Sequence, residues 1–371
     1  MNSLNRRAFL GAAGVGGLML ATGVPASAQG RAVSTVYIGS FTSWGTPPGP
    51  GFVVGSADSV SGKLTLTGGV SGIVDPSWFA YSLDGRILYS TNESATGKVT
   101  AFSLADPLRP RVLNSANVNG AGPTHVSLHG KHLLTANYSS GSVSVLSLLA
   151  DGKVGAVTDV VKHTGGSRNS HAHQVVTDPS GRWIVVVDLG TDSVYVYSID
   201  TAGKLKLNQQ LVLPSGLGPR HLTFHPNGKF AYILGELRSE VTVAAWDATA
   251  GKFTPGQVIS TLGGAKPPEN YPGEIQISPD GRFVYASNRG HDSLATFVVG
   301  EQGKSLAFVS TTPTGGTWPR HFTLGPGGNW VYVANQNSHT INWLPRDPGT
   351  GKLGTSAGSV KVNSVGIVSF K

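Results

Sequence analysis

The feature that most constrains the fold of this 371-residue chain is a segment that recurs six times. Each copy has an apolar strand-like run, a turn with a glycine, and a second apolar run that ends in polar residues, as in "GPRHLTFHPNGKFAYILGE". The turn glycines lie 45, 51, 47, 53 and 47 residues apart, at Gly85, Gly130, Gly181, Gly228, Gly281 and Gly328. A repeat of this length with strand-forming runs is typical of a β-propeller.

One copy shows how the repeat folds locally. Apolar residues alternate with polar ones on both sides of "HPNGK", which predicts a β-hairpin. Asn227 and Gly228 are expected to take the positive-φ positions of its turn. The two antiparallel strands would then bring Arg220 and His221 to the same rim as Glu236.

The ends of the chain supply a seventh unit. Third and fourth strands follow each hairpin, as in "GSVSVLSL", so six units are complete. Residues 36–42 resemble a second strand without its partner, and residues 363–370 resemble the missing inner strand. Their pairing predicts an all-β, seven-bladed β-propeller of four-stranded antiparallel blades, closed by strands from both termini, in a single domain over residues 29–371. A large β-sandwich, the alternative, does not explain the phased repeat.

Residues 1–28 have the composition of an export signal. Arg6 and Arg7 precede a Gly- and Ala-rich apolar stretch, and "ASA" at 26–28 precedes Gln29. This pattern predicts a twin-arginine signal, which exports folded proteins. A Sec signal or a retained membrane anchor is the alternative. We expect a periplasmic or secreted protein with no stable membrane association after cleavage, since no other segment is long and apolar enough to span a bilayer.

The amino-acid composition limits the kinds of chemistry and of binding partner that we expect. The chain has no Cys, which excludes disulfides and thiolate chemistry and leaves His and carboxylates as metal ligands. The formal net charge is +8, but the Lys residues are scattered and no basic run alternates with aromatics, so nucleic acid is not an expected partner. We expect a monomer that binds a small molecule.

Polar residues converge on one mouth of the predicted channel. Each inner strand lines that channel, so residues seven or eight before a turn glycine, and those about eight after it, share one rim. They are Trp78, Glu93, His125, Tyr138, His171, His173, Asp188, Arg220, His221, Glu236, Glu274, Arg289, Arg320, His321 and Gln336. A polar cluster at a concave end is a candidate functional site, although any single member could instead tie neighbouring blades together.

The residue types at this rim suggest an anionic or carbonyl-rich ligand, because several arginines point into one place. His171 and His173 are two apart on one strand, point the same way and have metal-ligand spacing, with a rim Glu as third ligand. The surrounding arginines would repel a cation, so we expect no metal; the metal site remains the alternative.

Several motifs together resemble one family. "SHAH", "DLGTD", "GPRHLTFHPNGK", "SPDGRFVYASNRGHDS" and "TGGTWPRHF" are similar to the seven-bladed lactonases, which include bacterial propeller-type 6-phosphogluconolactonases and fungal carboxy-cis,cis-muconate cyclases. The resemblance spans about residues 35–370. It implies lactone hydrolysis or formation without metal or cofactor. It places catalytic roles on His171, His173, Arg220, Glu236 and Arg289, and leaves as substrate-binding candidates Glu93, His125, Tyr138, Asp188, His221, Glu274, Arg320, His321 and Gln336.

The expected function is therefore an exported, metal-independent lactonase acting on a sugar-acid or carboxylated lactone. Glu236 or one His would activate water, while Arg220 and Arg289 hold the carbonyl oxygen or a substrate carboxylate. No serine nucleophile is expected, because no G-x-S-x-G stands on a strand-to-helix turn. A non-catalytic propeller that binds an anionic ligand or a protein partner is the rival.

Two features depart from the family pattern. The export signal does not fit a cytoplasmic sugar-phosphate pathway, so phosphogluconolactone is not the expected substrate. Residues 42–52, "TSWGTPPGPGF", form a longer link than expected, so one wall of the mouth should differ.

Overall fold

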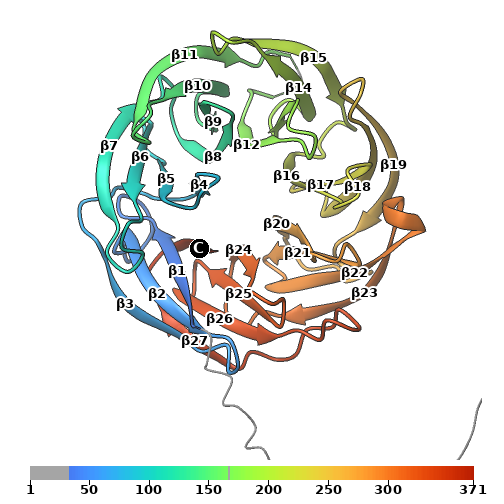
Figure 1. Ribbon diagram of the computed structural model, residues 1–371. Coiled ribbons are helices and arrows are strands. Elements are labelled where there is room, and N and C mark those ends of the chain that lie inside the picture. Colours follow the sequence, from blue (N-terminus) through green and yellow to red (C-terminus); the bar gives the residue numbers. More distant parts are fainter. Residues whose placement is uncertain (1–32, 166–167) are drawn as a thin grey trace, which may run out of the picture. The chain divides into compact units, whose positions relative to one another are not determined.

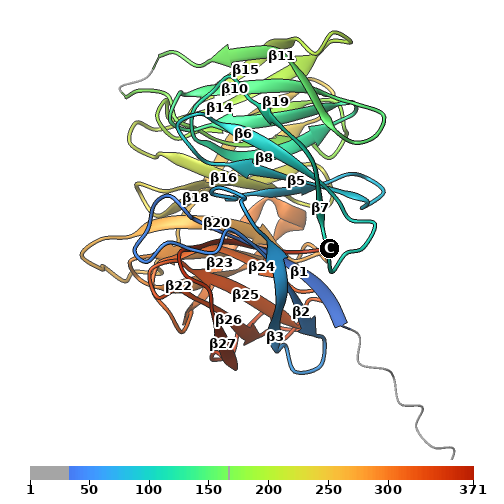
Figure 2. The same cartoon turned by 90° about the vertical axis from the view of Figure 1, so that its left-hand side faces the viewer.

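The computed structural model describes residues 33–165 and 168–371, so the predicted export signal lies outside the described residues. Seven four-stranded antiparallel sheets are arranged as blades around a central axis (Figures 1 and 2). The predicted seven-bladed β-propeller is thus confirmed.

The strands fall into four concentric sets (Figure 1). The inner strands are β4 (Phe79–Tyr81), β8 (Pro123–His129), β12 (Ala172–Thr177), β16 (Pro219–Phe224), β20 (Tyr271–Ile277), β24 (Pro319–Leu324) and β28 (Val365–Phe370). The second strands are β5 (Ile87–Asn92), β9 (His132–Asn137), β13 (Ile184–Asp188), β17 (Phe230–Gly235), β21 (Phe283–Arg289), β25 (Trp330–Asn335) and β1 (Val33–Ser40).

The outer half of each blade completes the ring. The third strands are β6 (Lys98–Ser103), β10 (Ser142–Leu148), β14 (Ser193–Ile199), β18 (Glu240–Asp247), β22 (Ser293–Gly300), β26 (Thr340–Pro345) and β2 (Phe52–Asp58). The outer strands are β7 (Arg111–Asn117), β11 (Val154–Lys162), β15 (Leu205–Val212), β19 (Lys252–Ser260), β23 (Ser305–Pro313), β27 (Gly358–Lys361) and β3 (Leu64–Val70). A short 3₁₀ turn, η1 (Glu301–Gly303), joins β22 to β23.

Strands from both ends of the chain close the ring. β28 pairs antiparallel with β1, from Val36 opposite Phe370 to Ser40 opposite Val365. The predicted closure is confirmed, and it ties the last strand into the same blade as the first.

Adjacent blades are held together by apolar packing and by repeated hydrogen bonds. Tyr232 and Leu234 of β17 pack with Ile275 of β20 in one buried cluster. The same tyrosine donates its hydroxyl hydrogen to the carbonyl of Gly303 in the next blade, at 3.0 Å. The equivalent tyrosines of three other blades contact Gly62, Gly152 and Gly351 in the same way. Each blade therefore fixes the position of its neighbour, and with it the inner strands.

The hairpin between β16 and β17 forms as predicted, but its turn differs in detail. The amide of His225 donates to the carbonyl of Phe230 at 2.8 Å, so four residues, not two, lie between them. Loops of this length are built around a type I turn, in which only the last residue needs positive φ. Gly228 has φ 68°, whereas the prediction that Asn227 shares a positive φ is wrong; its side chain accepts from the amide of Lys229 at 2.9 Å.

The inner strands carry bulges near one end. Pairing with the second strand shifts between Pro123 and His125 in β8, Ala172 and Gln174 in β12, Pro219 and His221 in β16, Pro272 and Ile275 in β20, and Pro319 and His321 in β24. The residues skipped by the ladder include His173, Arg220 and Arg320. A bulge re-aims the side chain of its extra residue. The fold thus turns these polar side chains out of the regular alternation at one mouth.

Candidate active site

An ion-pair triad joins the two ends of the β16–β17 hairpin to the next blade. One oxygen of Glu236, Oε2, lies 3.1 Å from Nε of Arg220 and 2.8 Å from Nη2 of Arg289. Arg220 also donates to the carbonyl of Gly273, and Arg289 donates through Nε to the carbonyl of Tyr271 at 2.7 Å. Burial lowers the pKa of both arginines; for Arg220 the charges of Arg289 and Arg320 lower it further, while those of Glu236 and Glu274 oppose this effect. Arg220, Glu236 and Arg289, which were predicted to lie at one rim, thus lie together in the structure.

A third arginine completes the basic side of the mouth. Nη2 of Arg320 lies 3.7 Å from Oε2 of Glu93, and its guanidinium lies over the rings of Phe41, at 4.9 Å, and Trp44, at 5.5 Å. Burial raises the pKa of the Glu93 carboxyl. Trp44 belongs to the long 42–52 link and is 39% exposed, so this link does form part of the wall.

Three histidines, a tryptophan and a carboxylate are packed together beside the arginines. Glu274 places Oε2 3.1 Å from Nδ1 of His221 and 3.6 Å from Nε2 of His321. Trp78 packs on His125, with ring centres 4.2 Å apart, and edge-on against the other two histidines. Burial lowers the pKa of His125 and His221 well below the ordinary value, and that of His321 to about 4, so these rings are neutral at pH 7.

The two histidines of "SHAH" flank one tyrosine. His171, just before β12, stacks on Tyr138 with ring centres 4.4 Å apart, and its Nδ1 lies 3.0 Å from the Tyr138 carbonyl. A carbonyl oxygen only accepts, so Nδ1 of His171 carries a hydrogen. His173 meets the same ring edge-on at 5.6 Å, and its Nδ1 lies 3.1 Å from Nε2 of His221. Burial and nearby Arg220 lower its pKa well below the ordinary value.

Comparison with known proteins decides the family. The family model described as "Lactonase, 7-bladed beta-propeller" matches residues 35–370. The chain belongs to this lactonase family. It is 32% identical over 335 residues to a 6-phosphogluconolactonase of Bacillus subtilis, covering 88% of this chain and 95% of that one. It is 31% identical over 337 residues to a 6-phosphogluconolactonase of Formosa agariphila, covering 86% of this chain and 94% of that one.

A solved structure agrees with this placement. The periplasmic gluconolactonase of Pseudomonas aeruginosa matches with a TM-score of 0.85 and 31% sequence identity, over 91% of this chain and 99% of that chain. The resemblance read from the motifs is therefore confirmed, and the mouth described above is the candidate active site of this lactonase-family chain.

Two predicted site residues are used differently from the rest. Asp188 is fully buried, and its carboxylate accepts hydrogen bonds from Nδ1 of His163 at 2.7 Å, from Ser170 and from the amide of His171 at 3.0 Å. These contacts give Asp188 a supporting role for the segment that carries His171, and its assignment to substrate binding stays a prediction. Gln336 is 7% exposed; its backbone amide donates to the carbonyl of Trp318, and its side-chain oxygen has no hydrogen-bond partner among the described residues.

The sequence analysis missed two aromatic residues at this mouth. Trp44 covers Arg320, and Trp318 lies 5.5 Å from the Arg289 guanidinium, an arrangement typical of a cation–π contact. Trp318 has φ 63°, a backbone conformation that a bulky residue adopts only when its surroundings require it. The signal was visible in the sequence, since Trp318 directly precedes the "PRH" that contains Arg320.

No metal site accompanies the histidines. Within residues 33–165 and 168–371, no group of three or more His, Asp or Glu is arranged to hold a metal ion. Among the same residues, no helix has the length and apolar character needed to cross a membrane.

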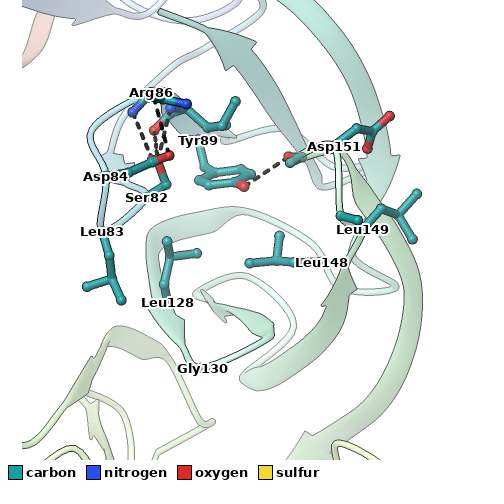
Figure 3. A pocket seen from close by; sticks show the side chains of 13 residues that line it. Ser82, Leu83, Asp84, Arg86, Tyr89, Leu128, Gly130, Leu148, Leu149 and Asp151 are labelled. Atoms are coloured by element: carbon teal, nitrogen blue, oxygen red, sulfur yellow. Dashed lines mark hydrogen bonds and ion pairs between the residues drawn. The ribbon is translucent and has the colours of Figure 1, made fainter.

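A larger hollow of about 560 Å³ lies away from this mouth, at the turn ends of the β4–β7 and β8–β11 blades (Figure 3). In four other blades Trp183, Phe230, Phe283 or Trp330 packs against a glycine between the third and outer strands of the next blade, whereas here Ile87 faces the equivalent Gly152. The lining of the hollow includes four leucines, and its charged residues already have partners: Asp84 pairs with Arg86, and Asp151 pairs with Lys153. The hollow is thus best explained as a packing difference between blades.

Proposed function

We propose that this protein hydrolyses the lactone of a sugar acid or a related carboxylated lactone outside the cytoplasm. The observation that carries the proposal is the convergence of Arg220, Arg289 and Arg320 with neutral histidines at one channel mouth. Fixed guanidiniums stabilise the oxyanion that forms when water attacks a carbonyl, and a neutral imidazole can take the proton of that water.

The triad assigns different tasks to its members. One carboxylate oxygen of Glu236 is already paired with two guanidiniums, so Glu236 holds Arg220 and Arg289 in place. A histidine of the "SHAH" pair then takes the proton from water as the water oxygen bonds to the carbonyl carbon. The ring C–O bond breaks, and the same proton passes to the departing alkoxide. The product is the open-chain hydroxy acid.

The charge at the mouth favours a substrate with little negative charge. Three arginines face three carboxylates, Glu236, Glu93 and Glu274, so their formal charges balance. This balance suits a neutral aldonolactone better than a phosphate dianion. The solved relative is described as a periplasmic gluconolactonase, which supports an unphosphorylated substrate, although the Bacillus subtilis relative is named for a phosphorylated one.

The experiment that tests this proposal is a lactone screen with the chain that begins at Gln29. Glucono-δ-lactone, 6-phosphogluconolactone and a carboxymuconolactone would each be followed by acid release in a pH-stat, against the spontaneous rate. We expect the fastest enzymatic hydrolysis with the unphosphorylated aldonolactone. If no lactone is hydrolysed faster than its spontaneous rate, but calorimetry shows that a lactone or hydroxy acid still binds, the result would favour the non-catalytic binding protein.

Location is tested separately with the full-length chain. If residues 1–28 are a twin-arginine signal, replacing Arg6 and Arg7 with lysines leaves the precursor in the cytoplasm, and the exported protein begins near Gln29 by intact mass. Unchanged export of the double-lysine variant would exclude that route.

A further inference from the structure

A line of three buried side chains runs across three neighbouring blades. Glu274 of β20, His221 of β16 and His173 of β12 are 3%, 1% and 6% exposed. Oε2 of Glu274 lies 3.1 Å from Nδ1 of His221, and Nε2 of His221 lies 3.1 Å from Nδ1 of His173. The far end of the line, Nε2 of His173, makes no hydrogen bond to the part of the chain that the structure describes. His173 also lines the small cavity that Arg220 and Arg320 share.

The partners at each step determine where the hydrogens lie. Burial raises the pKa of the Glu274 carboxyl, whereas interactions with His321 and Arg220 and the hydrogen bond from the Ile275 amide favour its ionised form. With Glu274 ionised, the carboxylate only accepts, so Nδ1 of His221 donates to it. A neutral imidazole has one N–H, so Nε2 of His221 accepts, and Nδ1 of His173 donates to it. The remaining nitrogen, Nε2 of His173, is left with a lone pair.

We propose that Glu274 and His221 are positioning residues that hold the hydrogen of His173 on Nδ1, so that its Nε2 is the base of the reaction. This inference rests on the proposed lactone hydrolysis. Nε2 takes a proton from the water whose oxygen bonds to the lactone carbonyl carbon. It returns that proton to the ring oxygen when the C–O bond breaks. Between these steps the imidazolium of His173 is stabilised by the Glu274 charge through His221.

The inference separates the two histidines of "SHAH". His171 has its Nδ1 hydrogen fixed by a backbone carbonyl, a neutral group. His173 has its Nδ1 hydrogen fixed by a line that ends in a carboxylate, which favours the protonated ring during the reaction. His173 lines one small cavity with Arg220 and Arg320, and burial and the charges of these arginines lower its pKa, which keeps the ring neutral before it takes a proton.

Glu274→Gln provides a sharp test because the structure predicts how the amide must lie. Oε1 of Glu274 accepts from the amide of Ile275 at 2.9 Å, so the glutamine oxygen is held there and its NH₂ group faces His221. Nδ1 of His221 must then accept, its Nε2 must donate to His173, and the hydrogen of His173 moves to Nε2. A change of nearly equal shape thus removes the lone pair.

The hydrogen positions can be read without any activity measurement. Nitrogen-15 spectra of the histidine-labelled mature protein distinguish protonated from unprotonated ring nitrogens, with signals assigned through His173→Gln and His221→Gln variants. We expect Nδ1–H on both rings in the wild type and Nε2–H on both in Glu274→Gln. A wild-type His173 with its hydrogen on Nε2, or no change in the variant, would overturn the inference.

His321→Gln is the matched control for this spectrum. His321 faces the same Glu274 oxygen, at 3.6 Å, but its Nδ1 has no partner among the described residues and does not lead to His173. We expect this variant to leave the hydrogen of His173 on Nδ1. A shift as large as that of Glu274→Gln would mean that general disturbance of the channel, and not the line, sets the tautomer.

Kinetics with the best lactone of the screen complete the test. Glu274→Gln should lower kcat by about 10²-fold or more with little change in KM, the scale expected when a general base has the wrong tautomer. If the tautomer changes while kcat stays normal, His173 is not the base, although the proposed hydrolysis stands. If the wild type hydrolyses no lactone, the proposed function fails and the assignment of His173 as its base fails with it, whereas the spectra still report the proton positions.

Discussion

Replacing Glu236 with glutamine removes the negative charge that Arg220 and Arg289 share. Both arginine side chains are under 10% exposed, at 3% and 7%, and the Glu236 side chain is 17% exposed. Breaking a buried ion pair costs about 3–5 kcal/mol. The amide oxygen remains a polar neighbour of both guanidiniums, and the Glu236 side chain is partly exposed, so we expect a smaller loss of about 2–3 kcal/mol in the free energy of unfolding.

The same variant should also impair catalysis. Two guanidiniums that lose their common partner no longer hold one fixed position for the oxyanion, which lowers kcat/KM by about 10²-fold. Thermal unfolding by circular dichroism and lactone hydrolysis would be followed on the same preparations, with the rate expressed per folded molecule. A clear fall in melting temperature with near-normal turnover would show that the triad is a structural tie between blades.

Glu93→Gln is the matched control. Glu93 lies at the same mouth with a similar side-chain exposure, 14%, but its oxygen is 3.7 Å from a single guanidinium, that of Arg320. Glu93 Oε2 accepts no hydrogen bond among the described residues, so we expect a smaller destabilisation than for Glu236→Gln, about 1 kcal/mol. If Glu93→Gln destabilises as much as Glu236→Gln, the sharing of one charge by two arginines is not what makes Glu236 matter.

Three further predictions concern packing, pH and metal. Ile87→Phe should raise the melting temperature by filling the hollow in Figure 3 as the aromatic residues of other blades do; a lower value would contradict the packing explanation. Burial alone would raise the pKa of Asp188, but hydrogen bonds from His163 and Ser170 outweigh it and lower the pKa to about 2. Its carboxylate thus stabilises the fold by about 2–3 kcal/mol above about pH 4, an effect lost as the pH falls through about 2, so Asp188→Asn should flatten the acid dependence of unfolding. Exhaustive EDTA treatment should leave lactone hydrolysis unchanged, and a loss that only Zn²⁺, Ca²⁺ or Mn²⁺ restores would favour a metal bound by His171 and His173.

The sequence contained most of the fold because every blade repeats one pattern. Period-two alternation and turn glycines at regular spacing predict strands and their order, and an unpaired strand at each end predicts ring closure. The meeting of Arg220 with Glu236 follows from the hairpin register alone. Ile87 was also visible in the repeat, since it stands where four other blades have Trp or Phe.

The sequence does not predict where side chains point when their residues leave the regular hydrogen-bond pattern between strands. His171 and His173 share one face of an ideal strand, but β12 begins after His171 and has its bulge at His173. The position of Trp44 over Arg320 depends on an irregular link held by Asp75, which accepts from the amide of Ser43 at 2.9 Å. Neither arrangement follows from alternation or spacing, because both depend on contacts between segments distant in sequence.

The two copies of "PRH" show why equal local sequence need not mean equal chemistry. Residues 219–221 and 319–321 open inner strands with a bulge at the same point, so both backbones present an arginine and then a histidine to the channel. Both histidines face Glu274, which lies on the blade between them, but from opposite sides. His221 therefore meets it through Nδ1 and keeps Nε2 for His173, whereas His321 meets it through Nε2 and leaves Nδ1 without a partner among the described residues. The repeat fixes where each histidine side chain leaves the backbone. The position of its blade in the ring determines which imidazole nitrogen stays free to act.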